Sequence, residues 1–334
     1  MKRLLLSSAL MLCAAVPVLT GCGLNAPASG GPPASQSQTA TPGTSGQKPH
    51  PVSASALISP PKGKYLGIEA YGLPGSLTPL INVAASIGRR PNLAGQYVAW
   101  GTPFDGAGAL QAWGYGALYY MAWEPYTTSV HDIAAGSSDS YIRRFAQAVR
   151  AFGLPVAISF GHEMNGNWYP WGSEATPAAT FVAAWRHIHN LFQAAGATNV
   201  IWVWNPNVIN AAPGVALRPY WPGSNYVNWV GLTGYFGLTG PDTFSGVFGP
   251  TMRQIREFTG KPFIIAETAV QSGPNAATCA QSLVHAVAAR ADVLGFIWFD
   301  YDKDGIDWRI ESRPPVRAEL AGSVANMPLV RIDS

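Results

Sequence analysis

Charged residues are scarce in this chain, which limits the partners that it can bind. Of its 334 residues only 12% are charged, the formal net charge is +3, and no run of basic residues is longer than two. Recognition of nucleic acid needs a basic stripe or patch on the surface. We therefore expect no nucleic-acid partner.

Cysteine is scarce as well, since Cys13, Cys22 and Cys279 are the only three in the sequence. The first two lie in the N-terminal segment, so Cys279 has no disulfide partner. A domain without disulfides must be stabilised by its hydrophobic core, and a chain of this length with 48% apolar residues can form one. No reactive motif surrounds Cys279, and we predict that it is a small buried residue.

The N-terminus has the features of an export signal. Lys2-Arg3 is followed by an apolar stretch over residues 4–19, which is short for a bilayer span. The stretch ends in Leu19-Thr20-Gly21-Cys22, which resembles the lipobox of bacterial lipoproteins. The resemblance implies cleavage after residue 21 and lipidation of Cys22. The alternative is an ordinary signal peptide with a coincidental cysteine.

The segment after Cys22 is typical of a linker. Residues 22–61 are rich in Pro, Ser, Thr, Gly and Gln and contain few large apolar side chains, so they cannot bury enough surface to fold. We predict a flexible tether there and one folded domain over residues 62–334. The domain would then be exported and held at a membrane by its lipid, as a monomer.

Apolar runs recur at regular intervals through the domain and predict eight strands. Each run is apolar throughout rather than alternating, which is typical of parallel strands that are buried on both faces. The runs are Tyr65–Ile68, Tyr97–Trp100, Leu118–Ala122, Val156–Phe160, Val200–Trp204, Trp229–Leu232, Pro262–Ala266 and Val293–Phe299.

Helical patterns lie between these runs. One begins at Ser138-Asp139 and ends at Gly153, a second begins at Thr176-Pro177 and ends at Gly196, and a third covers residues 277–289. Eight strand–helix units of this size predict a (β/α)8 TIM barrel. A doubly wound open sheet is the competing fold, but no glycine-rich phosphate loop follows the first strand.

Acidic residues follow several of the predicted strands, where a barrel of this type places its reacting groups. Glu69, Glu124, Glu163, Glu267 and Asp300 follow the first, third, fourth, seventh and eighth runs. Glu163 and Glu267 would face each other across the mouth of the barrel. Two such carboxyl groups can hydrolyse a glycosidic bond, with one as proton donor and the other as nucleophile or base.

The surroundings of these two glutamates predict different roles for them. Glu163 lies beside His162 and is followed by the aromatic loop Trp168-Tyr-Pro-Trp171, which favours a raised pKa and an acid/base role. Glu267 would stay ionised as the nucleophile. The chain has 12 tryptophans, many of them in Gly- and Pro-rich stretches, and exposed rings of this kind can stack on sugars.

The segment Gly161-His-Glu-Met-Asn-Gly-Asn-Trp-Tyr-Pro-Trp-Gly172 resembles the acid/base signature of glycoside hydrolase family 26, the β-mannanase family. The resemblance extends over residues 62–315. It rests also on Trp123-Glu124-Pro125, Val230–Tyr235, Ile265-Ala266-Glu267, Trp298-Phe299 and Asp307-Trp308-Arg309. One departure is Thr233, where the family pattern has an aspartate.

The resemblance implies a retaining mechanism with Glu163 as acid/base, Glu267 as nucleophile, carboxyl groups about 5–5.5 Å apart, and no cofactor or metal. It implies that Tyr235 hydrogen-bonds the nucleophile and that Trp298 is the floor on which the sugar stacks. The other residues that we expect to bind substrate are His162, Trp168, Asn165, Trp123 and Glu124.

The loop after the eighth strand allows a second interpretation. Asp300, Asp302, Asp304, Gly305 and Glu311 match the spacing of an EF-hand calcium loop, but a strand precedes them where a helix is required. We expect Asp307-Trp-Arg309 to form an ion-paired brace instead.

The sequence thus predicts an endo-β-1,4-mannanase that acts on β-linked polysaccharide. The same mechanism on mixed-linkage β-glucan or β-1,3-xylan is the first alternative. A surface lipoprotein that binds glycans without cleaving them is the second, and the presence of both Glu163 and Glu267 argues against it.

Overall fold

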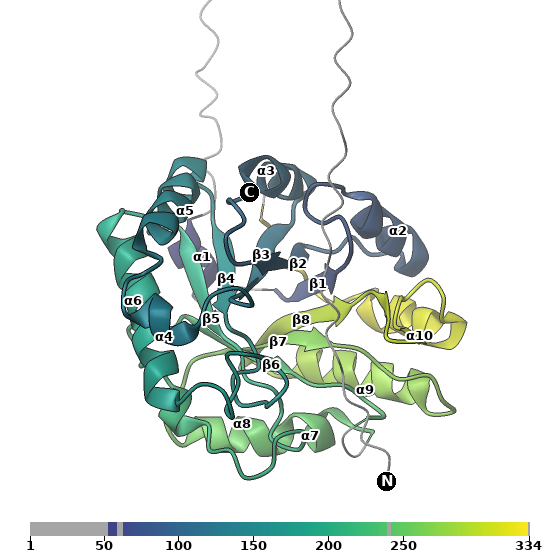
Figure 1. The fold of residues 1–334 in the computed structure, drawn as a ribbon. Helices are drawn as coiled ribbons and strands as arrows, with labels where there is room; N and C mark the ends of the chain where they lie inside the picture. The colour runs from purple at the N-terminus through teal and green to yellow at the C-terminus, as the bar shows by residue number, and fades with distance from the viewer. Residues whose placement is uncertain (1–52, 59–62, 239–241, 333–334) are drawn as a thin grey trace, which may run out of the picture. The chain divides into compact units, whose positions relative to one another are not determined.

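The computed structural model describes residues 53–58, 63–238 and 242–332, and these form an eight-stranded parallel barrel (Figure 1). The strands pair in chain order, and β1 closes the barrel against β8. The barrel strands are β1 (Tyr65–Glu69), β2 (Leu93–Ala99), β3 (Leu118–Glu124), β4 (Val156–Phe160), β5 (Val200–Trp204), β6 (Trp229–Thr233), β7 (Phe263–Thr268) and β8 (Val293–Phe299).

Helices surround the barrel, as Figure 1 shows, and a short hairpin follows its last strand. The helices are α1 (Ala54–Ile58), α2 (Thr78–Ile87), α3 (Gly106–Tyr115), α4 (Val130–Ala134), α5 (Asp139–Phe152), α6 (Ala178–Ala194), a 3-10 turn (Arg218–Tyr220), α7 (Phe244–Val247), α8 (Gly249–Arg256), α9 (Ala276–Ala289) and α10 (Pro314–Val324). The hairpin consists of β9 (Asp302–Lys303) and β10 (Ile306–Asp307).

The predicted TIM barrel is confirmed, including all eight strands and their parallel order. The predicted bounds of β4, β5 and β8 match the structure, and β2 begins four residues earlier than its apolar run. The left-handed Gly153 (φ 74°) ends α5 as the sequence pattern indicated, because a residue without Cβ adopts this conformation freely.

Two apolar clusters stabilise the barrel. Alternate strand residues such as Tyr120 and Ala122 point inward and fill the barrel, while their neighbours Tyr119, Met121 and Trp123 point outward against the helices. This double burial explains why the strands read as continuous apolar runs. Cys279 is buried on α9, as predicted.

The predicted tether ends earlier than expected. Residues 22–52 lie outside the described residues, but Ala54–Ile58 form the helix α1, whose Ala54 and Leu57 are buried with Tyr65 and Val203 of the barrel. The predicted boundary at residue 61 is therefore wrong. This helix is only five residues long and lies in a polar segment, so its apolar residues did not form a recognisable helical pattern.

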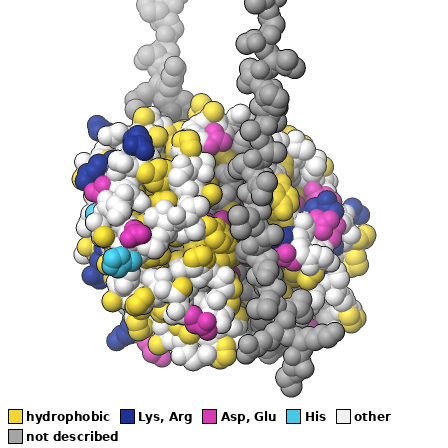
Figure 2. All heavy atoms as spheres, in the orientation of Figure 1, with side chains coloured by type: hydrophobic (Ala, Val, Ile, Leu, Met, Phe, Trp, Pro, Cys, Tyr) yellow, Lys and Arg dark blue, Asp and Glu magenta, His cyan; other side chains and the backbone are white. Residues whose placement is uncertain are grey.

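Charged side chains are few on the face that Figure 2 shows, and apolar and uncharged surface lies between them. Within the described part of the chain, no helix is long and apolar enough to cross a membrane. The predicted signal peptide and the lipidation site Cys22 lie outside the described residues.

Candidate active site

Glu163 lies in the loop after β4 with a backbone conformation that is unusual for a glutamate. Its φ angle is 54°, in the left-handed region that non-glycine residues rarely occupy. Its amide donates to the carbonyl oxygen of Asn205 at 2.6 Å, which fixes the turn. Strained backbone of this kind occurs preferentially at functional sites.

Two short hydrogen bonds hold the Glu163 carboxyl group. Trp168 Nε1 donates to its Oε2 at 2.6 Å, and Asn207 Nδ2 donates to its Oε1 at 2.6 Å. The indole of Trp168 lies across Gly166, where a Cβ atom would overlap the ring. Trp168 remains partly exposed, so it can contact a ligand as well as Glu163.

Asn165 holds Asn207 in position. Its Nδ2 donates to the Asn207 carbonyl oxygen at 2.9 Å, and its Oδ1 accepts from the Asn207 amide at 2.8 Å. Asn165 is fully buried, and both of its side-chain polar atoms form hydrogen bonds with the loop after β5. We therefore correct the prediction that it binds substrate.

Glu267 lies near the end of β7 and accepts hydrogen bonds from two tyrosine hydroxyl groups. Tyr235 donates to its Oε1, so the hydrogen bond expected from the resemblance is present. Tyr97 of β2 donates to its Oε2 at 2.6 Å. Both donors favour the ionised carboxylate, since each hydroxyl proton points at a negative oxygen.

Burial raises the pKa of both glutamates, but the two have different partners. The pKa of Glu163 rises to about 8, first through burial and then through the charge of Glu267, although the hydrogen bonds from Trp168 and Asn207 lower it. Burial also raises the pKa of Glu267, whereas the Tyr235 and Tyr97 hydroxyl groups and the Lys303 charge lower it. The arrangement therefore favours a proton on Glu163 and a negative charge on Glu267.

Two further glutamates face the same region. Glu124 ends β3 half-buried, and burial raises its pKa to about 8, while the charge of Lys303 opposes this. Glu69 ends β1 and is 1% exposed. Glu124 interacts with the charge of Glu267, its substrate-binding role stays a prediction, and Lys303 on the hairpin supplies a positive charge to these acids.

His162 is fully buried beside Glu163. Its ring contacts Tyr97 and Tyr169, with ring centroids 5.6 and 5.0 Å away, and its Nε2 lies 3.3 Å from the Tyr169 hydroxyl. Burial lowers its pKa to about 3, so the ring is neutral. His162 thereby supports Tyr97, the donor to Glu267, and its surface is covered in this structure.

Two predicted substrate-binding tryptophans point away from the site. Trp123 is fully buried on the outer face of β3, where it stacks on Phe145 of α5 at 4.5 Å between ring centroids. Trp298 is fully buried on the outer face of β8, and its Nε1 donates to the Trp308 carbonyl oxygen at 2.8 Å. Both assignments were wrong because each strand is apolar on both faces and the sequence did not show which face a residue occupies.

Two other aromatic rings lie beside Tyr235. The inward neighbour Phe299 lies 5.9 Å from Tyr235, and Trp308 lies 5.2 Å from Tyr235, measured between ring centroids. Trp308 follows the hairpin, whose base is held by Asp300: its Oδ1 accepts from the Ile310 amide at 2.8 Å. Of these two rings, that of Trp308 lies closer to Tyr235, which donates to Glu267.

The expected brace is present in this hairpin. Arg309 donates to both carboxylate oxygens of Asp307, at 2.9 and 2.7 Å, and its Nη2 lies 3.6 Å from Asp302. Asp302 and Asp307 pair across β9 and β10. These carboxylates therefore face an arginine, and no group of three or more acids, histidines or cysteines among the described residues could hold a metal ion.

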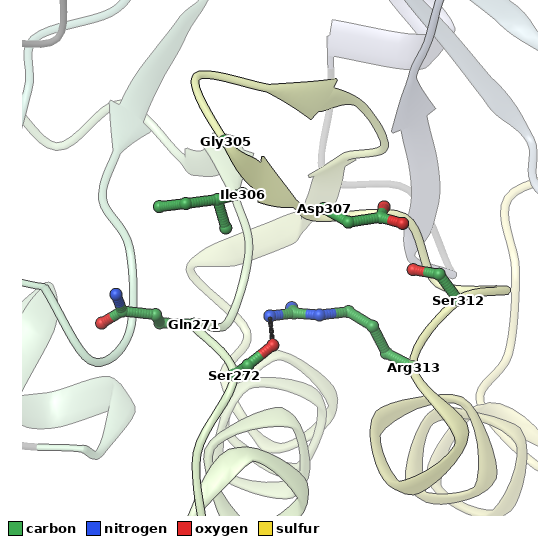
Figure 3. Close-up of a pocket in the computed structure, with 7 residues that line it drawn as sticks. All are labelled: Gln271, Ser272, Gly305, Ile306, Asp307, Ser312 and Arg313. Carbon is green, nitrogen blue, oxygen red and sulfur yellow. Dashed lines mark hydrogen bonds between the residues drawn. The ribbon is translucent and has the colours of Figure 1, made fainter.

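A cavity of about 310 Å³ lies between the loop after β7 and this hairpin (Figure 3). Its floor is the buried Arg313, which donates to the Val270 carbonyl oxygen and to Ser272 Oγ at 2.8 Å. The guanidinium also lies 5.7 Å from the Trp308 ring. Arg313 thus connects the two loops that position Trp308.

Asn207, Tyr97 and Trp308 are the residues that our reading of the sequence did not assign to the site. Asn207 follows β5, so the rule that located the glutamates would have found it if applied to all polar residues. Tyr97 began the predicted second run, and its place in the C-terminal half of β2 became clear only because the strand starts four residues earlier. The pair of glutamates with different partners can supply a proton donor and a carboxylate nucleophile to one substrate.

The sequence profile of glycosyl hydrolase family 26 matches residues 135–308, more than half of the chain. The chain is 34% identical to Endoglucanase H of Acetivibrio thermocellus over 258 residues, which cover 72% of this chain and 28% of that protein. It is 31% identical to a mannan endo-1,4-beta-mannosidase of Bacillus subtilis over 123 residues, which cover 35% of this chain and 31% of that protein. The chain thus spans less than a third of these curated relatives.

Solved structures show the same barrel. A modular endo-β-1,4-mannanase from Cellulomonas fimi superposes with a TM-score of 0.64 at 17% identity, covering 84% of this chain and 75% of that one. A mannanase from Bacillus subtilis gives 0.60 at 16% identity, covering 83% and 90%. The fold agrees with the profile match, and the matched segment contains Glu163 and Glu267: the chain belongs to glycosyl hydrolase family 26.

Proposed function

We propose that the protein is a retaining glycoside hydrolase that cleaves β-linked polysaccharide with Glu163 and Glu267. The observation that carries this proposal is the contrast between the two carboxyl groups. Glu163 is buried with an indole and an amide donor, and its pKa is raised to about 8. Glu267 accepts two hydroxyl protons that favour its charge.

In the first step Glu163 protonates the glycosidic oxygen while Glu267 attacks the anomeric carbon. The bond to the leaving sugar breaks, and a covalent glycosyl–enzyme ester forms on Glu267. In the second step Glu163, now ionised, removes a proton from water, which attacks the anomeric carbon and releases Glu267. This sequence requires the two carboxyl groups to lie about 5–5.5 Å apart, which remains a prediction.

The surrounding residues have supporting roles in this proposal. Tyr235 and Tyr97 orient the Glu267 carboxylate, and Asn207 and Trp168 orient Glu163. The partly exposed Trp168 would contact the sugar being cleaved, and the buried Trp308 ring would support Tyr235. Glu124 lies at the same mouth and would hydrogen-bond a sugar hydroxyl.

We propose β-1,4-mannan as the substrate, as the family resemblance implies and as the matched mannan endo-1,4-beta-mannosidases support. β-Glucan is the second candidate, because the match to Endoglucanase H covers 72% of this chain whereas the mannosidase matches cover 25–35%. β-1,3-Xylan is a third, since a beta-1,3-xylanase from Vibrio also matches, over 32% of the chain.

Release of reducing sugar by residues 53–334 tests both the reaction and the substrate. Galactomannan, glucomannan, mixed-linkage β-glucan and β-1,3-xylan would be compared at equal concentration. Glu163→Ala and Glu267→Ala should each lower the rate by about 10²- to 10⁴-fold. Glu257→Ala, at an exposed glutamate that follows α8, is the matched control and should keep full activity.

Activity on one polymer, lost in both variants, would support the proposal and identify the substrate. A folded protein that binds these polymers without cleaving any of them would contradict it. That result would favour the non-catalytic glycan-binding lipoprotein.

We further propose that the protein is exported and anchored by lipid at Cys22. Growth of a producing bacterium with a clickable palmitate analogue should label the full chain, and Cys22→Ala should abolish the label and release the protein from the membrane fraction. Cys279→Ala is the control and should leave labelling unchanged, because Cys279 is buried in the domain. Unlabelled protein in the medium would contradict the anchor.

A further inference from the structure

Glu69 is a buried acid without a hydrogen bond of its own. It ends β1, points into the barrel and is 1% exposed, and neither carboxyl oxygen has a hydrogen-bond partner among the described residues. The chain makes room for it, since a Cβ atom on Gly95 of β2 would lie 2.8 Å from the Glu69 Cγ. An ionised carboxylate in such a place would carry a large desolvation penalty.

The Tyr97 hydroxyl interacts with both Glu267 and Glu69 and has one proton to donate. That proton goes to Glu267 Oε2 at 2.6 Å. Tyr97 also neighbours the Glu69 carboxyl, and it would lower the pKa of Glu69 if it turned this proton to Glu69 instead. Because the hydroxyl proton is already committed, the Tyr97 oxygen can interact favourably with Glu69 only as an acceptor. Glu69 must then carry the proton that it donates.

The charges around Glu69 favour the same state. Burial raises its pKa well above the ordinary value, and the negative charge of Glu267 raises it further. The positive charge of Lys303 opposes this from the hairpin. The titratable groups that face Glu69 from the surrounding elements are Tyr97, Tyr120, Glu124, Tyr235, Glu267, Tyr301 and Lys303.

Uncharged hydroxyl groups also lie in the barrel layer around Glu69. The Tyr120 hydroxyl of β3 and the Ser159 hydroxyl of β4 are buried and, like Glu69, have no hydrogen-bond partner among the described residues. Tyr120 neighbours both Glu69 and Ser159. Hydroxyl groups can donate to or accept from a neutral acid, so this layer accommodates a protonated Glu69 without a counter-ion.

We propose that Glu69 is a neutral carboxylic acid that donates its proton to the Tyr97 hydroxyl and so positions Tyr97 to hold Glu267. Glu69 is in this sense a positioning residue, which acts on the nucleophile through Tyr97. The inference rests on the proposed function for the role of Glu267. The protonation of Glu69 does not depend on that function, since its burial without a hydrogen-bond partner among the described residues supports it independently.

The pH dependence of stability tests the protonation without any need for activity. An acid with a folded-state pKa above its unfolded value contributes stability that is present at low pH and is lost as the pH rises through and above the unfolded pKa of about 4.5. Glu69→Gln matches the neutral acid in size but cannot ionise. The variant therefore does not lose this stability as the pH rises. The Tm of Glu69→Gln minus that of the wild type should therefore be near zero at pH 4 and rise steadily towards pH 8.

Glu257→Gln is the matched control for this measurement, because Glu257 is exposed. Its Tm difference from the wild type should stay flat over the same range. A difference for Glu69→Gln that is flat, or that falls as the pH rises, would contradict the proposal, since it would mean that Glu69 is ionised. Failure of Glu69→Gln to fold at any pH would contradict it as well.

The positioning role predicts a specific pattern of rates. Glu69→Gln can still donate to Tyr97 through its amide and should keep kcat within about threefold. Glu69→Leu and Tyr97→Phe should each lower kcat by about tenfold with KM little changed. The double variant should also lose about tenfold, because both changes break one chain of hydrogen bonds.

Losses that multiply to about a hundredfold, or a Gln variant as slow as the Leu variant, would contradict the positioning role. If the wild type cleaves none of the glycans, the proposed function fails, while the Tm measurement still decides whether Glu69 is protonated.

Discussion

At the scale of single residues, the site consists of two glutamates whose neighbours give them opposite tendencies. The indole of Trp168 and the amide of Asn207 hold Glu163, which burial keeps protonated. Two tyrosine hydroxyl groups hold Glu267. Both carboxyl groups are buried and both accept hydrogen bonds that lower their pKa, so the neighbouring charges separate the two roles: Glu267 raises the pKa of Glu163, and Lys303 lowers the pKa of Glu267.

Removal of the Asn207 side chain should disturb Glu163 in a measurable way. Asn207→Ala deletes a donor that favours the ionised form of Glu163, so the alkaline pKa in the pH profile of kcat/KM should move upward. Rate should fall by about tenfold at neutral pH, because the carboxyl group loses its orientation. Asn210→Ala, at an exposed asparagine in the same loop, should change neither quantity. An unshifted alkaline limb in Asn207→Ala would contradict this role.

The pH profile follows from the protonation states of the pair. Activity should fall as the pH rises through about 8, because Glu163 then loses the proton that it must donate. It should also fall at low pH, where Glu267 becomes protonated and can no longer attack. A rate that keeps rising beyond pH 9 would be incompatible with Glu163 as the proton donor.

At the scale of elements, which face of a strand a residue occupies decides whether it can act on the substrate. On β3 the residues Tyr120 and Ala122 face inward, so Trp123 faces α5 and Glu124 faces the mouth. On β8 the same alternation sends Trp298 outward and Phe299 towards Tyr235. A shift of one residue would exchange these assignments.

Variants of two tryptophans should separate these faces. Trp123→Phe removes packing against Phe145 and the 3.2 Å hydrogen bond from Trp123 Nε1 to the Tyr141 hydroxyl, so it should lower the free energy of unfolding by about 1–3 kcal/mol with kcat/KM nearly unchanged. Trp168→Phe loses the hydrogen-bond donor to Glu163, so it should lower kcat/KM and leave the free energy of unfolding nearly unchanged. Denaturant unfolding and initial rates measured on both proteins check this prediction. A large rise in KM for Trp123→Phe would contradict it and indicate that Trp123 binds substrate.

At the scale of the whole molecule, the sequence predicted the barrel and the position of the proposed catalytic pair because both follow from local patterns. Eight apolar runs gave the strands, and the acids that follow them gave Glu163 and Glu267. The partners of these acids come from other strands: Asn207 lies 44 residues from Glu163, and Tyr97 lies 170 residues from Glu267. Such pairings depend on the closed barrel and are not visible in any one segment.

The helix α1 extends the domain beyond its predicted start. A chain that begins at residue 63 loses the burial of Ala54 and Leu57 against the barrel, so its Tm should lie several degrees below that of a chain that begins at residue 53. The rate should stay the same, since the catalytic residues lie at the C-terminal ends of the strands. Thermal unfolding of the two proteins side by side measures the difference, and equal Tm values would place α1 outside the folded unit.

In the proposed mechanism Glu267 forms a covalent bond with the substrate. An activated 2-deoxy-2-fluoro β-glycoside of the sugar that the enzyme accepts should trap this intermediate, because the fluorine slows its breakdown more than its formation. Mass spectrometry of proteolytic fragments should then find one glycosyl adduct, on Glu267, in the wild type and none in Glu267→Ala. An adduct on Glu69 or Glu124, or turnover of substrate with inversion of the anomeric centre and no adduct, would contradict the account.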